Sequence, residues 1–219
     1  MFASETASAE AIRAIVPDMV PRPLAWGAYA SSPLTHFYLA EFRPLATRAI
    51  VVAATTISTT LESNPEPILP DPARFAAKIA ALHRDSVSPT GKFGFGITTY
   101  SGTLPHDNGW EDSWQVFFSK SLRAALEHEA RAKGADDEVD RLAASVFETV
   151  IPRLLGPLES AGRSVKPALV HGDLWYGNAG VHAETGEPFV FDACCFYAHN
   201  ECEWVGRRQR EDETERLRN

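Results

Sequence analysis

The sequence predicts an α+β fold in which a small β-rich part precedes a larger, mainly helical part. Two runs of apolar and aromatic residues, 21–29 and 36–42, flank a Ser-Ser-Pro turn and predict a pair of strands. Two long segments, 112–133 and 136–155, carry apolar side chains at helical spacing. A third observation is a strand, loop and strand pattern in 169–192 that carries several polar side chains. These polar side chains support the functional hypothesis.

Composition narrows the class of protein. Of 219 residues, 44% are hydrophobic and 23% are charged, which is typical of a folded globular chain. The formal net charge of -8 argues against a nucleic-acid or anionic-membrane partner, because such surfaces need clustered Lys and Arg. The sequence has no apolar run long enough to span a bilayer and no evident secretory signal, so we expect a cytoplasmic protein.

Local signals predict further elements along the chain. Residues 5–15 are expected to form a short amphipathic helix. Asp71 and Pro72 form an N-cap and first-turn pair that opens the next helix. Residues 93–99 predict a strand, and Pro152 is expected to kink or end the helix over 136–155.

The most informative motif runs from Leu169 to Asp192. It presents Asp173, then Asn178 five positions later, then Asp192 after an apolar run, which is the order of polar groups in a kinase catalytic loop. Phosphoryl transfer needs a carboxylate that orients the attacking hydroxyl and takes its proton, plus hard oxygen ligands for Mg²⁺. Asp173 fits the first role, and Asn178 and Asp192 fit the second. A turn at 184–187 is expected to join the flanking strands and bring the three side chains together.

A single Asp or Asn in a loop is most often a turn former or a helix cap. The hypothesis therefore depends on the conjunction of these residues in order and in a strand-turn-strand context. One block of the chain consists of His171-Gly172-Asp173-Leu174-Trp175, Gly177-Asn178, Phe191-Asp192 and Phe196-Tyr197-Ala198-His199-Asn200-Glu201. A second consists of Lys92-Phe93-Gly94-Phe95, Gly102, Pro105, Asn108, Trp110, Trp114 and Phe117-Phe118. Together they resemble the fructosamine kinase (ketosamine and ribulosamine 3-kinase) family, within the aminoglycoside phosphotransferase-like kinase group.

The resemblance implies a protein-kinase-like fold and ATP-dependent phosphorylation of the 3-hydroxyl of a ketosamine. The substrates would be glycated protein lysines or small ketosamines, from which phosphorylation removes the sugar adduct, and the cofactors would be ATP and Mg²⁺. Asp173 would be the base and His171 would brace its loop by hydrogen bonding. Asn178 and Asp192 would hold Mg²⁺, and Trp175, which distinguishes this family within the group, would wall the sugar pocket.

The resemblance also assigns roles outside the motif. Glu5 would pair with a lysine that holds the nucleotide phosphates, and Glu41 and Phe42 would lie at the hinge where adenine binds. Asn108 and Trp110 lie on a predicted loop and are candidates for substrate binding.

The sequence departs from the family in two respects. It has no Gly-x-Gly-x-x-Gly and no Gly-x-x-x-x-Gly-Lys-Ser/Thr, so we expect a chain shortened at its N-terminus. Residues 207–216 are almost devoid of apolar side chains, where the resembled family continues with several helices, so we expect a chain divergent at its C-terminus. The predicted organisation is a partial small lobe over 1–43, an atypical insert over 44–70, a catalytic lobe over 71–204 and a charged tail over 205–219.

Three alternatives remain open from the sequence. The chain could phosphorylate another hydroxylated small molecule, such as an aminoglycoside or choline. It could be a catalytically inactive kinase-like remnant, because the glycine-rich loop and the lysine are missing. Cys195, His199 and Cys202 have a spacing that could bind zinc, but the set lacks a fourth ligand.

Overall fold

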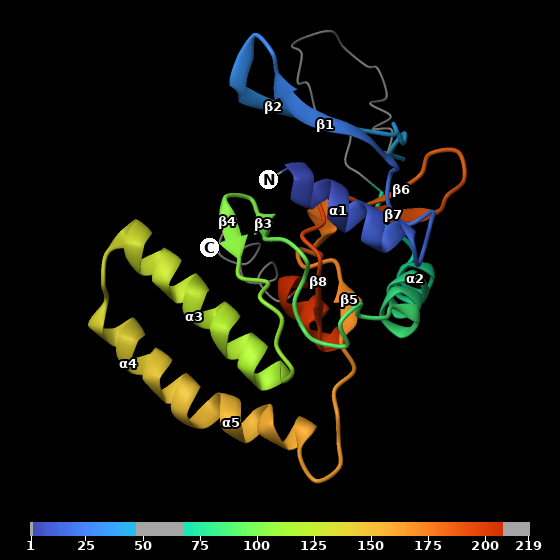
Figure 1. Cartoon of the computed structure of the whole chain (residues 1–219). Helices are drawn as coiled ribbons and strands as arrows, with labels where there is room; N and C mark the ends of the chain where they lie inside the picture. Colours follow the sequence, from blue (N-terminus) through green and yellow to red (C-terminus); the bar gives the residue numbers. More distant parts are fainter. Residues whose placement is uncertain (1, 47–67, 208–219) are drawn as a thin grey trace, which may run out of the picture.

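A computed structural model of the chain describes residues 2–46 and 68–207 (Figure 1). Most of the atypical insert expected at 44–70 therefore lies outside the described residues, as does most of the charged tail. Within the described ranges, short antiparallel strand pairs combine with helices, as expected for an α+β fold.

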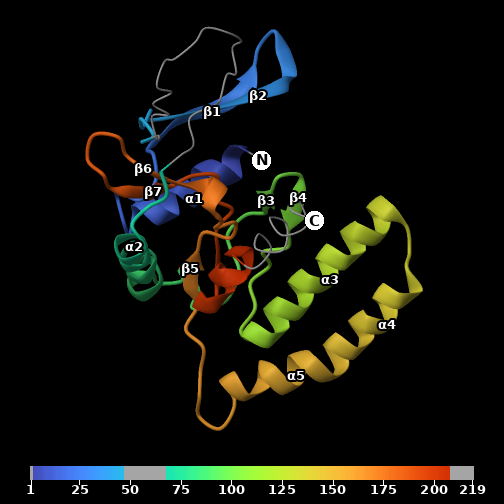
Figure 2. The same ribbon diagram turned by 180° about the vertical axis from the view of Figure 1, so that it is seen from behind.

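The N-terminal part consists of one helix and one hairpin. Helix α1 (Phe2–Arg13) confirms the helix predicted over 5–15. Strand β1 (Pro23–Tyr29) pairs antiparallel with β2 (Ser32–Ala40), which confirms the predicted strand pair. The hairpin lies at one end of the molecule, and α1 lies between it and the larger part (Figures 1 and 2).

Two further antiparallel strand pairs lie in the larger part. Strand β5 (Ala168–Val170) pairs with β8 (Phe196–Ala198), and β6 (Ala179–Val181) pairs with β7 (Pro188–Val190). The strands predicted at 169–170 and 188–191 are confirmed, but the prediction that the turn at 184–187 joins them is wrong. That turn joins β6 to β7. Strand β6 was missed because three residues, one of them glycine, are too short to show a period.

Strand β5 separates two hydrophobic clusters because successive side chains on a strand point to opposite faces. Leu169 is fully buried in a cluster with Ile12 and Leu82, whereas Val170 is fully buried in a cluster with Phe93 and Trp114. Packing on both faces fixes the end of β5, and the residue after Val170 begins the predicted catalytic loop.

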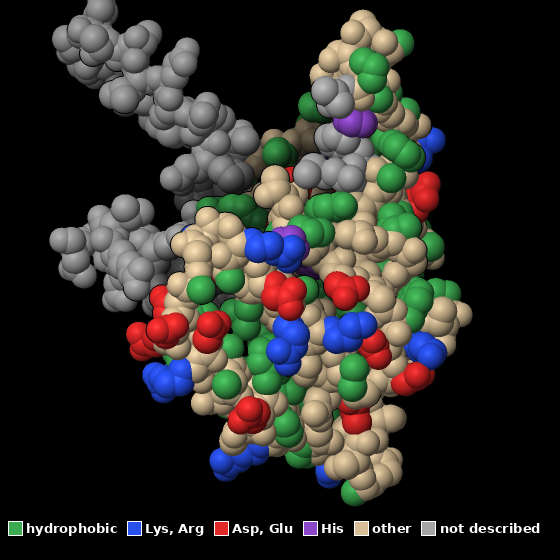
Figure 3. Space-filling view, turned by 60° about the vertical axis from the view of Figure 1, so that its left-hand side comes forward, with side chains coloured by type: hydrophobic (Ala, Val, Ile, Leu, Met, Phe, Trp, Pro, Cys, Tyr) green, Lys and Arg blue, Asp and Glu red, His purple; other side chains and the backbone are tan. Residues whose placement is uncertain are grey.

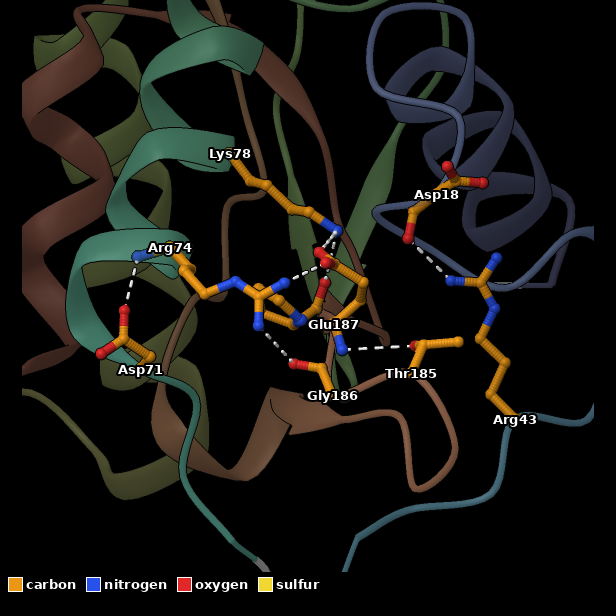
Figure 4. A network of polar contacts seen from close by, with 9 residues as sticks. Asp18, Arg43, Asp71, Arg74, Lys78, Thr185, Gly186 and Glu187 are labelled. Carbon is orange, nitrogen blue, oxygen red and sulfur yellow. Dashed lines mark hydrogen bonds and ion pairs between the residues drawn. The ribbon is translucent and has the colours of Figure 1, made fainter.

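Helix α2 (Pro72–Asp85) begins as predicted, with the Asp71 carboxylate accepting the Arg74 N–H at 2.9 Å. Glu187, in the β6–β7 hairpin, accepts one hydrogen bond from the Arg74 side chain, and its carboxylate lies 3.1 Å from the Lys78 Nζ (Figure 4). This network attaches α2 to the hairpin that leads to Asp192.

The strand predicted over 93–99 is wrong. Phe93 and Gly94 form only isolated bridges, and the regular pair is β3 (Thr99–Ser101) with β4 (Leu104–His106). Gly94 has a φ of +129°, and a Cβ there would lie 2.7 Å from the Asn108 carbonyl oxygen. The glycine therefore bends the chain against its neighbour, which interrupts a continuous strand.

The two long helices predicted over 112–133 and 136–155 are confirmed. Helix α3 (Trp114–Lys133) is followed by α4 (Asp137–Ser145), a π-helical turn η1 (Val146–Val150) and α5 (Ile151–Leu154). The π turn ends two residues before Pro152, which lacks the N–H that an α-helix needs at that position, so the local widening takes the place of a sharp break.

The remaining short elements are 3₁₀ turns, η2 (Gly156–Glu159), η3 (Tyr176–Asn178) and η4 (Asn200–Arg207). Acidic and basic side chains are interspersed on the face seen in Figure 3. Among the described helices, none is both long enough and apolar enough to cross a membrane.

Candidate active site

The loop after β5 is held in place by its own backbone. Gly172 has a φ of +86°, and a Cβ there would lie 2.4 Å from the Cys194 carbonyl oxygen. Only glycine fits such a left-handed position at so close an approach. The Cys194 N–H donates to the His171 carbonyl at 2.9 Å, so the loop is joined to the segment that follows Asp192.

The His171 side chain links the two halves of the site. Its Nδ1 accepts the Asp173 N–H at 3.3 Å, and its Nε2 lies 3.0 Å from the Phe191 carbonyl oxygen. Since Nδ1 is an acceptor, the proton of the neutral ring is on Nε2, which donates to Phe191. Complete burial lowers the pKa of His171 and keeps the ring neutral. His171 thus hydrogen-bonds both to Asp173 and to the residue before Asp192.

Asp173 and Asn178 are in direct contact. The Asn178 Nδ2 donates to the Asp173 carbonyl at 3.0 Å and to the Asp173 Oδ2 at 3.1 Å. Asn178 is 6% exposed, and its backbone carbonyl oxygen accepts the Phe191 N–H at 3.1 Å. The two bonds that Nδ2 donates fix the side-chain amide, which leaves its Oδ1 as the atom that could contact a cation. The bond from Phe191 places the backbone of Asn178 beside the residue that precedes Asp192.

Asp192 follows β7 with a φ of +56°, a region that residues other than glycine seldom adopt. Such strain persists where surrounding structure enforces it, and it often marks functional positions. The α1 helix brings Glu5 into the electrostatic field of Asp192. Burial, and then Asp192, raise the pKa of Glu5 to about 7. Burial, and then Glu5 and Asp192, raise the pKa of Tyr38 to about 12. Glu5 was expected to pair with a lysine; the described side chain that acts most strongly on its carboxyl is that of Asp192.

This environment of Glu5 predicts a pH-dependent stability. The Glu5 carboxyl binds its proton more tightly in the folded chain, with a pKa of about 7, than at its ordinary value of 4.5. The folded state therefore loses stability as the pH rises from 4.5 to 7. Glu5→Gln is expected to flatten this dependence and to raise the free energy of unfolding at pH 8 by roughly 1 kcal/mol, after allowance for solvent screening.

Urea unfolding at several pH values between 5 and 8 measures this effect. Glu10→Gln, which removes an exposed acid from the same helix, is the matched control and should leave the slope unchanged. Equal slopes for wild type and Glu5→Gln would show that folding does not raise the pKa of Glu5.

One residue of the site was missed from the sequence. Glu203 is 5% exposed, and its carboxylate accepts the N–H groups of His171 at 2.5 Å and Gly172 at 3.1 Å. The Nε2 of His83, at the end of α2, lies 3.4 Å from the same carboxylate. Glu203 thus binds the start of the loop that carries Asp173. Its only sequence signal is an acid between Cys202 and Trp204, in a segment without clear periodicity.

Trp175 lies at the surface of the loop. Its indole is 41% exposed and packs edge-on against Tyr176, with ring centroids 4.7 Å apart. A Cβ on Gly177 would lie 2.4 Å from the Trp175 Cζ2, so the indole rests directly on that glycine. The site therefore presents an aromatic surface close to Asp173 in the chain.

Of the two loop candidates for substrate binding, Asn108 is buried and Trp110 is half-buried. Asn108 is 4% exposed, and its Nδ2 donates to the Ile97 carbonyl and to the Thr99 Oγ1, both at 2.9 Å. The Thr99 hydroxyl in turn donates to the Cys194 carbonyl at 3.2 Å. Trp110 packs on Tyr197, with ring centroids 6.2 Å apart. Asn108 and Trp110 thus contact the segment 194–197, which follows Asp192, Asn108 through Thr99 and Trp110 directly.

The candidate hinge residues differ in their surroundings. The Glu41 N–H donates to the Arg22 carbonyl at 2.8 Å, and its carboxylate accepts the Arg22 N–H at 3.1 Å, which holds the pKa of Glu41 below its usual value. Phe42 is 87% exposed. The backbone N–H of Glu41 is therefore already engaged with Arg22, the residue before β1.

Zinc binding finds no support among the described side chains. Cys194 and Cys195 are buried, and their sulfur atoms contact Ser101 and Ser8 respectively. Over the described ranges, no three side chains of His, Cys, Asp or Glu cluster as a metal site would require.

Known proteins share both the sequence and the fold. A family model described as fructosamine kinase matches residues 1–205. Ketosamine-3-kinase of Mus musculus is 36% identical over 112 residues, which covers 51% of this chain and 34% of the mouse protein. The chloroplastic protein-ribulosamine 3-kinase of Oryza sativa subsp. indica is 29% identical over 134 residues, which covers 61% of this chain and 37% of the rice protein.

A solved structure extends the likeness to the fold. A crystal structure from Haemophilus somnus 129PT, described as a candidate fructosamine-3-kinase, superimposes with a TM-score of 0.62 at 22% identity, covering 93% of this chain and 57% of that one. The predicted kinase-like α+β fold is thereby confirmed, and the matches cover 34% and 37% of the two curated relatives. The resemblance found in the two residue blocks is confirmed as well: the chain belongs to the fructosamine kinase family.

Proposed function

We propose that this chain carries the phosphotransfer site of an ATP-dependent kinase that phosphorylates the 3-hydroxyl of ketosamines, either on glycated protein lysines or on small amines. The observation that carries the proposal is the contact between the Asn178 amide and the Asp173 carboxylate, within a chain of the fructosamine kinase family. The names of the mouse and rice relatives supply the substrate class.

Asp173 would act as the general base. Because Asn178 holds its Oδ2, the Oδ1 is free to accept the hydrogen bond of the sugar 3-hydroxyl. The hydroxyl proton passes to Asp173 as the oxygen bonds the γ-phosphorus and the bond to the ADP oxygen breaks. His171 keeps the carboxylate aligned through the Asp173 N–H, and its neutral state avoids a competing charge beside the base.

The donor set fits Mg²⁺. Asn178 Oδ1 and the Asp192 carboxylate are hard oxygen ligands, and hydrogen bonds fix the Asn178 amide and the backbone beside Asp192. When bound, Mg²⁺ would neutralise charge on the nucleotide phosphates. It would also offset the repulsion that the acids Glu5 and Asp192 exert on each other.

The remaining assignments follow from position. Trp175 would wall the sugar site, since an indole face suits the C–H surface of a sugar. Asn108 and Trp110 would position the segment that supports Cys194, and Glu41 and Phe42 would border the nucleotide. The cytoplasmic location stays a prediction.

Gly177→Ala tests the Trp175 wall. The new methyl group would push the indole aside, because it would lie 2.4 Å from the ring. Since the indole is partly exposed and can move, we expect the free energy of unfolding to fall by less than about 1 kcal/mol. The KM for a ketosamine should rise roughly 3- to 10-fold.

Steady-state kinetics and urea unfolding measure the two effects separately. Gly96→Ala is the matched control, because a Cβ there meets no atom within 4 Å. If Gly177→Ala left the KM for the ketosamine unchanged, Trp175 would not contact the sugar.

An assay of ATP turnover tests the proposed function. Fructoselysine and ribuloselysine are compared with an aminoglycoside and choline, in the presence of Mg²⁺, and product phosphorylation at the 3-position is checked by NMR. Transfer to the ketosamines supports the proposal. Transfer only to the other alcohols, or binding of MgATP without transfer to any of them, would contradict it.

A further inference from the structure

A cavity outside the candidate active site is lined by residues of α2, by residues of the segment 158–168 that leads into β5, and by His199 and Asn200. Its volume is about 840 Å³. Its apolar lining includes Ile79, Leu158 and Val165. Among the described residues that line it there is no Asp and no Glu, which is unusual for a chain with a formal charge of -8.

Three cationic side chains line the same cavity: Arg84, Arg163 and Lys166. The charge of Arg84 is offset by Asp85, which accepts two hydrogen bonds from it at 2.8 Å. Lys166 donates to the Arg84 carbonyl at 2.5 Å, and the Arg163 Nε donates to the Pro157 carbonyl at 2.6 Å. Asp85 also acts electrostatically on Lys166, whereas the described partners of Arg163 are the Pro157 carbonyl and the Ser160 hydroxyl, so the charge of Arg163 remains available to a ligand.

Two imidazoles complete the wall. The Nδ1 of His199 accepts the Glu201 N–H at 3.1 Å, so its neutral ring carries a proton on Nε2 and can donate to a ligand. His83 also lines the cavity, and its Nε2 lies 3.4 Å from the Glu203 carboxylate. His83 thus connects the cavity to Glu203, which binds the loop that carries Asp173.

We propose that this cavity binds a small organic anion with an apolar body, such as a carboxylate or phosphate ester that carries a hydrocarbon group. The volume is in the range of small-molecule sites, which combine an apolar lining with a few polar groups that fix orientation. The apolar lining buries the hydrocarbon, and Arg163 and Lys166 pair with the anionic group. The proposal concerns binding alone and does not depend on the kinase reaction.

A fluorescence titration with 8-anilinonaphthalene-1-sulfonate tests the proposal, with uncharged N-phenyl-1-naphthylamine as the probe of equal aromatic body. We expect saturable binding of the sulfonate and clearly weaker binding of the uncharged probe. Arg163→Gln should weaken sulfonate binding roughly tenfold. Arg153→Gln, which removes an exposed arginine that does not line the cavity, should leave it unchanged.

Ala80→Trp places an indole in the cavity from an exposed position of α2 and should abolish the binding. Circular dichroism confirms that each variant is folded, and the Arg163→Gln comparison decides the matter should Ala80→Trp fail to fold. Equal binding of the two probes, or an equal loss in Arg163→Gln and Arg153→Gln, would overturn the proposal.

Competition identifies the ligand class. Octanoate and octyl phosphate, used below their micellar concentrations, should displace the sulfonate, whereas inorganic phosphate should not. Whichever of the two displaces it at lower concentration identifies the favoured anionic group. Displacement by inorganic phosphate as effective as by octyl phosphate would show a bare oxyanion site and contradict the apolar part of the proposal.

Discussion

Asp173→Asn is expected to lower kcat for phosphoryl transfer to a ketosamine by about 10²- to 10⁴-fold, the usual contribution of a positioned general base. The substitution keeps the shape of the side chain, and its oxygen can still accept the hydrogen bond that Asn178 donates. It removes the group that takes the hydroxyl proton. Since the loop geometry should persist, we expect the Kd for MgATP, measured by calorimetry, to change by less than about threefold.

The matched control is Glu184→Gln, which makes the same chemical change at an exposed residue of the turn between β6 and β7. It should retain full activity. Near-normal turnover in Asp173→Asn would exclude this residue as the base. A loss of MgATP affinity as large as the loss of turnover would instead assign Asp173 to the metal site. Calorimetry and turnover together therefore separate the two roles.

The parts of the site that could be predicted from the sequence are local. Asp173 and Asn178 are five positions apart on one loop, and the chain between Asn178 and Asp192 folds back as a single hairpin, so order and spacing alone indicate convergence. The apolar run that ends at Val170 and the Asp71-Pro72 start of α2 are equally local, because each depends on a few neighbouring residues.

The parts that could not be predicted depend on contacts between distant segments. Glu203 reaches His171 across 32 positions, and no periodic pattern marks an acid that is buried because backbone N–H groups meet it. The segment 93–99 failed as a strand prediction because Gly94 approaches the backbone of Asn108. Local propensity gives no information on such approaches, since they depend on how the two hydrophobic clusters pack.

Glu203→Ala is expected to lower the free energy of unfolding by about 2–5 kcal/mol, because it leaves the buried N–H groups of His171 and Gly172 without their acceptor. The His83 side chain loses its partner as well. The effect should reach the reaction, since these two N–H groups fix the backbone that carries Asp173. At a temperature well below the melting transition, we expect kcat to fall at least tenfold while the KM for ATP changes little.

A purely structural role and a positioning role predict different results for the conservative variants. Glu203→Asp keeps a carboxylate that can accept both N–H groups after a small shift, so it should recover much of kcat. Glu203→Gln replaces one acceptor with an N–H₂ group that faces a backbone donor, so it should stay impaired although it is closer in size. Glu201→Gln, an exposed acid on the same 3₁₀ turn, is the control. If kcat followed stability alone, with Gln and Asp equally active in folded protein, Glu203 would only hold the fold. Because the carboxylate contacts the backbone at the first two positions of the loop, we expect acceptor geometry to determine kcat.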